Sequence, residues 1–174
     1  MLATPKHFAA YGAVMGGLDY NSVEISEGTL RDVHLPPFKA AIDAGALTIM
    51  SAFNDINGVP ASANRELMTV VLRHEWKFRG FVVSDYTADF ELVAHGYASD
   101  DSEATQLAFN AGLDMSMQSG LYGAHLAALE AGQSLAKARQ AIPAALHGLG
   151  RQVALGVQAI ALAHGFLEVF DTLD

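Results

Sequence analysis

Several polar residues of this 174-residue sequence follow apolar runs and could take part in catalysis. They are Asp85 after Phe81–Ser84, Lys6 and His7 with the segment Thr4–Phe8, and Asn54, Asp55 and Asn57 after Leu47–Phe53. A carboxylate at a strand end can attack an anomeric carbon and form a covalent glycosyl intermediate. Nearby Lys and His side chains can donate hydrogen bonds to sugar hydroxyls and keep that carboxylate ionised. An aspartate in this position more often simply caps the following helix, so the pattern alone favours that interpretation.

Other catalytic motifs are incomplete in this sequence. The segment His74-Glu75-Trp76-Lys77-Phe78 begins like a zinc-binding H-E-x-x-H motif but ends in phenylalanine. The segment Gly148-Leu149-Gly150 lacks the third glycine of a dinucleotide-binding loop, and there is no G-x-S-x-G segment. The chain also contains no cysteine. We therefore expect chemistry that needs no metal and no cofactor.

The apolar periodicity predicts alternating strands and helices. Expected strands are Leu47–Phe53, Gly80–Ser84, Leu113–Met117 and the shorter segment Thr4–Phe8. Expected helices are Leu30–Ala44, Arg65–Trp76 capped by Asn64, Asp101–Ala111 capped by Asp101 or Ser102 and stopped by Gly112, and Leu121–Ala131. Such alternation is typical of an α/β fold with a parallel sheet. A complete (β/α)8 barrel needs about 250 residues, so either a small doubly wound domain or a piece of a barrel fits.

The composition narrows the range of partners. Apolar residues make up 51% of the chain and the formal net charge is -9. An acidic chain repels phosphate backbones, so we expect no nucleic-acid partner. The most apolar stretch, Val153–Leu167, contains polar residues and is too short to cross a bilayer, so no membrane partner is expected either.

Five segments together resemble glycoside hydrolase family 3, the β-glucosidase and β-xylosidase group. They are Lys6-His7-Phe8, Arg31–Phe38, Ile49–Pro60, Leu72–Tyr86 and Ala111–Met115, in the family's order. The segment Lys6–Val14 is especially similar to bacterial periplasmic β-glucosidases of this family. The resemblance covers about residues 1 to 132.

The resemblance implies a role for six residues. Asp85 would be the catalytic nucleophile, and Lys6 and His7 would bind the hydroxyls of the sugar that reacts. Met50 would form a wall of the same subsite. Two aromatic residues would also contact the substrate. Phe53 stands where many members have Tyr, and Tyr86 stands where many have Trp or His.

The resemblance also implies a domain organisation. Residues 1–132 would form the second half of the family's N-terminal TIM-like barrel, an α/β structure with about four parallel strands and surrounding helices. Residues 133–174 would form a divergent Ala/Leu-rich helical tail. The general acid/base of the family is usually a Glu of the following domain. Within this chain Glu66 and Asp55 are only nominal candidates for that role.

Two readings of the function follow from this organisation. The first is a β-glucosidase-type enzyme that hydrolyses terminal β-linked sugars of a small glycoside or oligosaccharide through a glycosyl-Asp85 intermediate. The second is a truncated and inactive half-barrel that binds sugar weakly or self-associates through its open edges. For full-length members of the group that the chain resembles, a periplasmic location is implied.

Overall fold

The computed structural model describes residues 2–132 of the chain. The expected helical tail 133–174, including the apolar stretch Val153–Leu167, lies outside these described residues. Within the described part, no helix is long and apolar enough to cross a membrane.

The centre of the fold is a parallel sheet whose strands follow the order of the sequence. The strands are β1 (Thr48–Met50), β4 (Phe81–Tyr86) and β5 (Met115–Met117), in the order β1-β4-β5. In register, Ile49 lies opposite Val82, and Val83 lies opposite Met115. A doubly wound sheet reverses its strand order at a switch point, whereas neighbours in a barrel follow the chain. The α/β prediction is confirmed, and the strand order favours the piece of a barrel.

The expected fourth strand, Thr4–Phe8, does not form as a regular strand. It joins the edge of β1 through an isolated parallel bridge between Phe8 and Ser51. The Phe8 N–H donates to the Met50 carbonyl at 2.8 Å, and the Ala52 N–H donates to the Phe8 carbonyl at 2.9 Å. Pro5 has no N–H to donate, which shortens the ladder on this side. The segment still extends the sequential order by one position.

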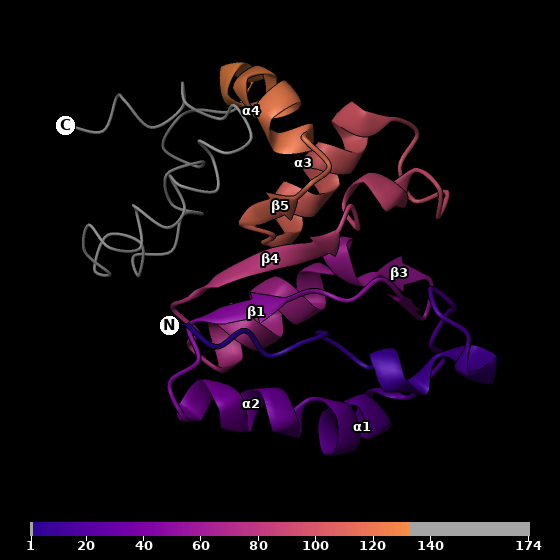
Figure 1. Cartoon of the computed structure of the whole chain (residues 1–174), viewed down its shortest axis with the longest axis vertical. Helices are drawn as coiled ribbons and strands as arrows, with labels where there is room; N and C mark the ends of the chain where they lie inside the picture. The colour runs from indigo at the N-terminus through magenta and orange to yellow at the C-terminus, as the bar shows by residue number, and fades with distance from the viewer. Residues whose placement is uncertain (1, 133–174) are drawn as a thin grey trace.

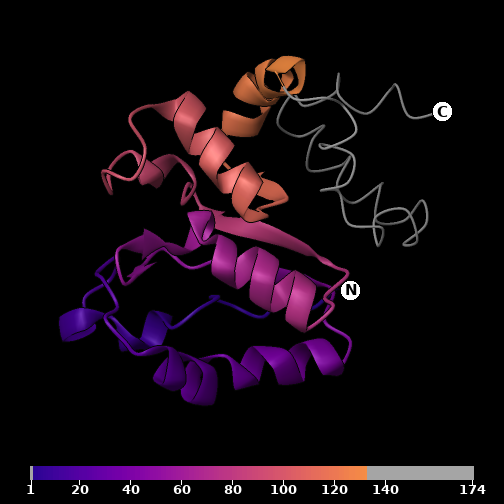
Figure 2. The same cartoon turned by 180° about the vertical axis from the view of Figure 1, so that it is seen from behind.

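Helices cover one face of the sheet. The helices are α1 (Glu27–Thr29), η3 (Leu30–His34), α2 (Pro36–Asp43), η5 (Glu66–Glu75), α3 (Asp101–Ala111) and α4 (Leu121–Gly132). The connections between elements also contain the short 3₁₀ turns η1 (Tyr11–Ala13), η2 (Met15–Gly17), η4 (Ala61–Ala63) and η6 (Phe90–Leu92). The magenta helix η5 lies behind the strands in Figure 1 and in front of them in Figure 2. No helix of the described residues covers the opposite face, which is the inner face of a barrel.

The helix expected over Leu30–Ala44 begins earlier and changes its winding. The Ser26 hydroxyl caps it by accepting from the Thr29 N–H, and the π-helical turn η3 separates α1 from α2. The Leu35 N–H reaches back to the Leu30 carbonyl at 3.0 Å. Two prolines, Pro36 and Pro37, follow at once. A proline has no N–H and its ring crowds the carbonyl four residues earlier, so the wider turn accommodates them.

The predicted caps are correct at two ends and wrong at a third. Asn64 Oδ1 accepts from the Leu67 N–H at 3.1 Å and caps η5. Gly112 ends α3 with a φ of 107°, in the left-handed region that glycine tolerates. The N-cap of α3 is Asp100, whose carboxylate accepts from the Glu103 N–H at 2.9 Å. Asp101 and Ser102, the two expected caps, are instead the first two residues of the helix.

A short hairpin leaves the carboxyl end of β1. Its strands are β2 (Asp55–Ile56) and β3 (Val59–Pro60), with Asn57 and Gly58 at positive φ in the turn. The Asn57 side chain accepts from the Ile25 N–H at 3.1 Å and donates to the Ile25 carbonyl at 2.9 Å. The hairpin is thereby fastened to the segment that precedes α1.

The core lies between the sheet and its helices. Ile49, Val82, Leu67, Leu72 and Leu113 are almost completely buried there. Near the amino end of β4, a buried ion pair joins Arg73 of η5 to Asp114, which also accepts from the Val82 N–H at 2.7 Å. These contacts hold the strands and η5 in a fixed register.

Candidate active site

The predicted site residues come from loops that meet at the carboxyl edge of the sheet. The segment that leads to η1, the hairpin β2–β3 and the loop after β4 all lie on the right in Figure 1. Asp85 belongs to the end of β4, and Met50 is the last residue of β1. In parallel α/β folds this edge is where catalytic groups gather.

Asp85 is a buried carboxylate whose two oxygens have different surroundings. Its residue surface is 9% exposed. Oδ1 accepts from the Tyr86 N–H at 2.7 Å, which fixes the orientation of the carboxylate. No well-aligned hydrogen-bond donor reaches Oδ2 from residues 2–132, although that atom is buried. Leaving a buried carboxylate oxygen without a donor is costly, so this atom is typical of a functional site.

His7 is the side chain that approaches this oxygen. His7 Nε2 lies 3.0 Å from Asp85 Oδ2, and the imidazole is one-quarter exposed. The contact is an ion pair only when His7 is protonated, because a neutral imidazole carries no charge. The sequence therefore placed two of its candidates correctly beside one another. Lys6, the neighbour of His7, is exposed at the same edge.

The other three candidates surround this pair at different depths. Met50 is half-buried and is joined to the N-terminal segment, since its N–H donates to the Pro5 carbonyl at 3.2 Å. Phe53 is half-buried as well and packs against the rings of Tyr11 in η1 and Tyr20 in the loop that follows. Tyr86 is 57% exposed and points its side chain away from the core. The substrate-binding roles of these residues remain predictions.

The loop after β4 contributes two carboxyl groups that the sequence patterns did not reveal. Partial burial raises the pKa of Glu91, and the charges of Asp85 and Asp89 act in the same direction. Asp89 is completely buried and accepts from the Ser119 hydroxyl at 2.8 Å, while its second oxygen has no partner among the described residues. Both groups belong to the loop that directly follows Asp85 in the sequence. Their short sequence distance from Asp85 could have predicted their proximity, because a loop at a strand end folds back on its own strand.

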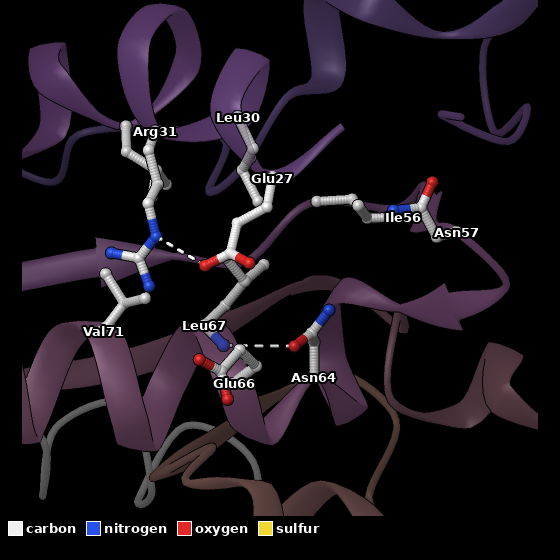
Figure 3. Close-up of a pocket in the computed structure, with 10 residues that line it drawn as sticks. Glu27, Leu30, Arg31, Ile56, Asn57, Asn64, Glu66, Leu67 and Val71 are labelled. Atoms are coloured by element: carbon white, nitrogen blue, oxygen red, sulfur yellow. Dashed lines mark hydrogen bonds and ion pairs between the residues drawn. The ribbon is translucent and has the colours of Figure 1, made fainter. Parts of the chain in front are cut away.

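Neither nominal acid candidate is placed to serve Asp85. Asp55 holds the hairpin, since Oδ2 accepts from the Ser22 hydroxyl at 2.5 Å and Oδ1 accepts from the Gly58 N–H at 2.9 Å. Glu66 instead lines a separate pocket of about 230 Å³ between α1, η3 and η5. Figure 3 shows this pocket with Arg31 already paired to Glu27 at 2.8 Å. Asn57 also lines this pocket, but Asp85 and the five predicted sugar-binding residues do not.

Metal ligation has no support within the part of the chain that the structure describes. Over residues 2–132, no three His, Asp or Glu side chains are arranged to hold an ion. The arrangement at Asp85 instead offers a carboxylate, an imidazole and aromatic surface. That combination suits attack on an uncharged substrate with ring-shaped apolar faces.

Comparisons with known proteins show which family the chain resembles. The sequence profile of the glycosyl hydrolase family 3 N-terminal domain matches residues 1–148. The chain is 46% identical over 129 residues to a periplasmic beta-glucosidase of Salmonella typhimurium, and 44% identical over 117 residues to a putative beta-xylosidase of Formosa agariphila. It also superposes on a beta-glucosidase of Listeria innocua in complex with glucose, with a TM-score of 0.77 and 42% identity over 82% of this chain.

The matched relatives are much longer than this chain. The alignments cover 74% and 66% of the chain but only 17% of the Salmonella protein and 16% of the Formosa protein. In the Listeria structure the match covers 20% of that chain. The shared segment is thus about a sixth to a fifth of each relative.

Proposed function

This chain belongs to glycosyl hydrolase family 3, and we propose that it carries the nucleophile and part of the sugar subsite of a retaining β-glycosidase. Asp85 is the proposed nucleophile. The observation that supports this role most directly is its buried Oδ2, which lies 3.0 Å from His7 Nε2 and has no aligned donor among the described residues. An oxygen in that state is free to form a bond to carbon.

The proposed reaction has two steps and balances as follows. Asp85 attacks the anomeric carbon of the terminal sugar, and the bond from that carbon to the leaving oxygen breaks while a carboxylic acid protonates this oxygen. Water then attacks the same carbon, loses a proton to the conjugate base and releases the Asp85 carboxylate. Two inversions give net retention. The general acid is not assigned to any residue of this chain.

The remaining predicted residues have binding roles in this proposal. Lys6 and His7 donate hydrogen bonds to hydroxyls of the reacting sugar, and Met50 and Phe53 form the apolar wall beside it. Exposed Tyr86 adjoins the same space. Terminal β-linked glucose or xylose is the proposed substrate class, because relatives of both kinds are similar to this chain over the segment that contains Asp85.

The proposal is tested with a reagent that needs no general acid. The full chain is incubated with 2,4-dinitrophenyl 2-deoxy-2-fluoro-β-D-glucoside, whose leaving group departs without protonation and whose fluorine slows hydrolysis of the glycosyl ester. Intact mass spectrometry should show one 2-fluoroglucosyl adduct, and peptide mapping should place it on Asp85. Asp85→Asn should give no adduct. Asp43→Asn, which alters an exposed ion pair with Lys39, should label like the parent chain.

The xylose analogue of the same reagent decides between the two sugar classes. Faster labelling by the fluoroglucoside supports a glucosidase, and faster labelling by the fluoroxyloside supports a xylosidase. If neither reagent labels the chain, or if the adduct maps to another residue, the nucleophile role of Asp85 is wrong for this protein.

A second candidate function is supported by the sheet itself. The Thr4–Phe8 segment and β5 form its two edges, and neither is paired further by the described residues. Exposed strand edges offer N–H and C=O groups to another chain. We therefore retain a self-associating, sugar-binding module as the alternative, which would show assembly without labelling.

A further inference from the structure

A loop beside the candidate active site carries an unusual group of aromatic side chains. This loop, residues 11–22, is closed by its own hydrogen bonds. The Met15 N–H donates to the Ser22 carbonyl at 2.9 Å, and Asn21 Nδ2 donates to the Met15 carbonyl at 2.9 Å. The Tyr11 hydroxyl also bonds to Asp19. The loop therefore presents its side chains from a fixed frame.

The aromatic rings form a continuous series that begins at the nucleophile. His7, the neighbour of Asp85, packs edge-on against Tyr11 with ring centroids 5.3 Å apart. Tyr11 lies 6.2 Å from Phe53, and Phe53 lies 4.5 Å from Tyr20. Each ring belongs to a segment at the carboxyl edge of the sheet. Tyr20 is the outermost member of the series.

Tyr20 is held in a conformation that core packing does not require. Its φ is 63°, which is rare for a bulky residue and costs free energy. Its surface is nevertheless 48% exposed, so burial of the ring does not repay that cost. Partial burial, followed by the charges of Glu91, Asp19 and Asp85, raises the pKa of its phenol. The phenol is therefore neutral at physiological pH.

The geometry of displacement indicates what such a ring would contact. The nucleophile and the leaving oxygen lie on opposite sides of the anomeric carbon, so the leaving-group unit lies farther from Asp85 than the reacting sugar does. The aromatic series likewise runs outward from His7 to an exposed end. Aromatic faces pack well against the C–H faces of a pyranose ring and against aryl groups.

We propose that Tyr20, supported from behind by Phe53, forms the surface that receives the leaving-group unit of the β-glycoside. The occupant is a second sugar ring or an aryl aglycone. This inference rests on the proposed function, because it needs a sugar bound at Asp85. It assigns a specificity role to the loop 11–22, which contributes nothing to bond breaking.

Two reagents with the same sugar and different leaving groups separate this role from the chemistry. One is 2-deoxy-2-fluoro-β-D-glucosyl fluoride, which has no leaving-group ring, and the other is the dinitrophenyl glucoside. Tyr20→Ala should lower the second-order labelling rate of the aryl reagent about three- to tenfold, the range of one aromatic contact. Its rate with the fluoride should stay unchanged. Tyr20→Phe should match the parent chain with both reagents.

Tyr97→Ala serves as the matched control, because Tyr97 is also exposed, at 37%, and belongs to a different loop. It should leave both rates unchanged. An equal loss with both reagents in Tyr20→Ala would mean a structural role and would overturn the inference. No loss with either reagent would overturn it too. Failure of the fluoride to label the parent chain would instead reject the proposed function, and this inference with it.

Discussion

Two buried aspartates of this fold differ in what surrounds them. Asp114 is neutralised by Arg73 and accepts from the Val82 N–H, so it joins η5 to the strands. Among residues 2–132, Asp85 accepts a single backbone N–H, and its other oxygen meets only His7. The first arrangement stabilises a fold, and the second leaves a carboxylate available for reaction. Sequence alone does not separate the two, since both follow apolar strand residues.

Asp114 gives a prediction for stability against pH. Burial raises the pKa of Asp114 to about 6, although the Arg73 charge and the Val82 N–H oppose this shift. The folded state then holds a proton more strongly than the unfolded state, whose pKa is about 3.8. The stabilisation from protonation is complete below pH 3.8 and is lost as pH rises through about 6.

Urea unfolding at several pH values measures this contribution. Asp114→Asn should remove the part of the pH dependence that lies between these two pKa values, on the order of 3 kcal/mol. The comparison concerns the slope, because the variant also weakens the contact with Arg73 and lowers stability at every pH. Parallel curves for the parent chain and the variant would contradict the assigned shift.

At the scale of elements, the sequence predicted most strands and helices but misplaced several junctions. Strands β1, β4 and β5 were visible as apolar runs, and α3 was placed correctly over Asp101–Ala111. Its cap is Asp100. The sequence could not identify this residue, because residues 100–102 are all polar and only the backbone conformation decides which of them caps the helix. The hairpin β2–β3 was not predicted, although Asn57-Gly58 is a typical two-residue turn.

The candidate active site was predictable only in part, again because backbone geometry decides some contacts. Asp85, Lys6 and His7 follow strand-like segments and so were expected to meet. Tyr20 lies well before β1 in sequence, and its ring reaches Phe53 only because the loop 11–22 folds back on itself. No periodic pattern reports a contact of that kind.

The start of β4 gives a prediction about packing between elements. A Cβ atom at Gly80 would lie 2.0 Å from the Leu47 carbonyl oxygen, a backbone atom that cannot rotate away. Gly80→Ala should therefore lower the free energy of unfolding by at least about 3 kcal/mol, because the two strands must separate. Urea denaturation measures the loss.

Gly28→Ala is the matched control for this substitution. Gly28 is exposed in α1, and its nearest atom at such a Cβ would be the Ser26 hydroxyl at 3.8 Å. Alanine should raise stability there by up to about 1 kcal/mol, since it restricts the unfolded chain. A Gly80→Ala variant as stable as Gly28→Ala would mean that β4 does not pass so close to Leu47.

At the scale of the whole molecule, the described sheet has two unpaired edges, and one of its faces is not covered by helices. The strand order predicts further strands beyond both edges in a closed barrel. The net charge of -9 opposes contact between copies at low ionic strength. Association through these edges should therefore depend on both concentration and salt.

Sedimentation velocity provides the measurement. The average sedimentation coefficient should rise with protein concentration, and it should rise more steeply at high salt, where charge repulsion is screened over a few ångströms. A single species of monomer mass at every concentration and at both salt levels would exclude the self-associating module. If Asp85 were labelled in that monomer, the enzyme hypothesis would be the one that is still supported.

The clasp between Asn57 and Ile25 also has a consequence for the chemical ageing of the protein. An asparagine followed by glycine loses its side-chain amide more readily than other asparagines do, because the glycine N attacks it with little hindrance. Deamidation would replace the Nδ2 donor that bonds to the Ile25 carbonyl with a carboxylate oxygen, and the two oxygens would repel each other. Stored protein would therefore begin to loosen at the hairpin beside the candidate active site, while the core around η5 is still intact.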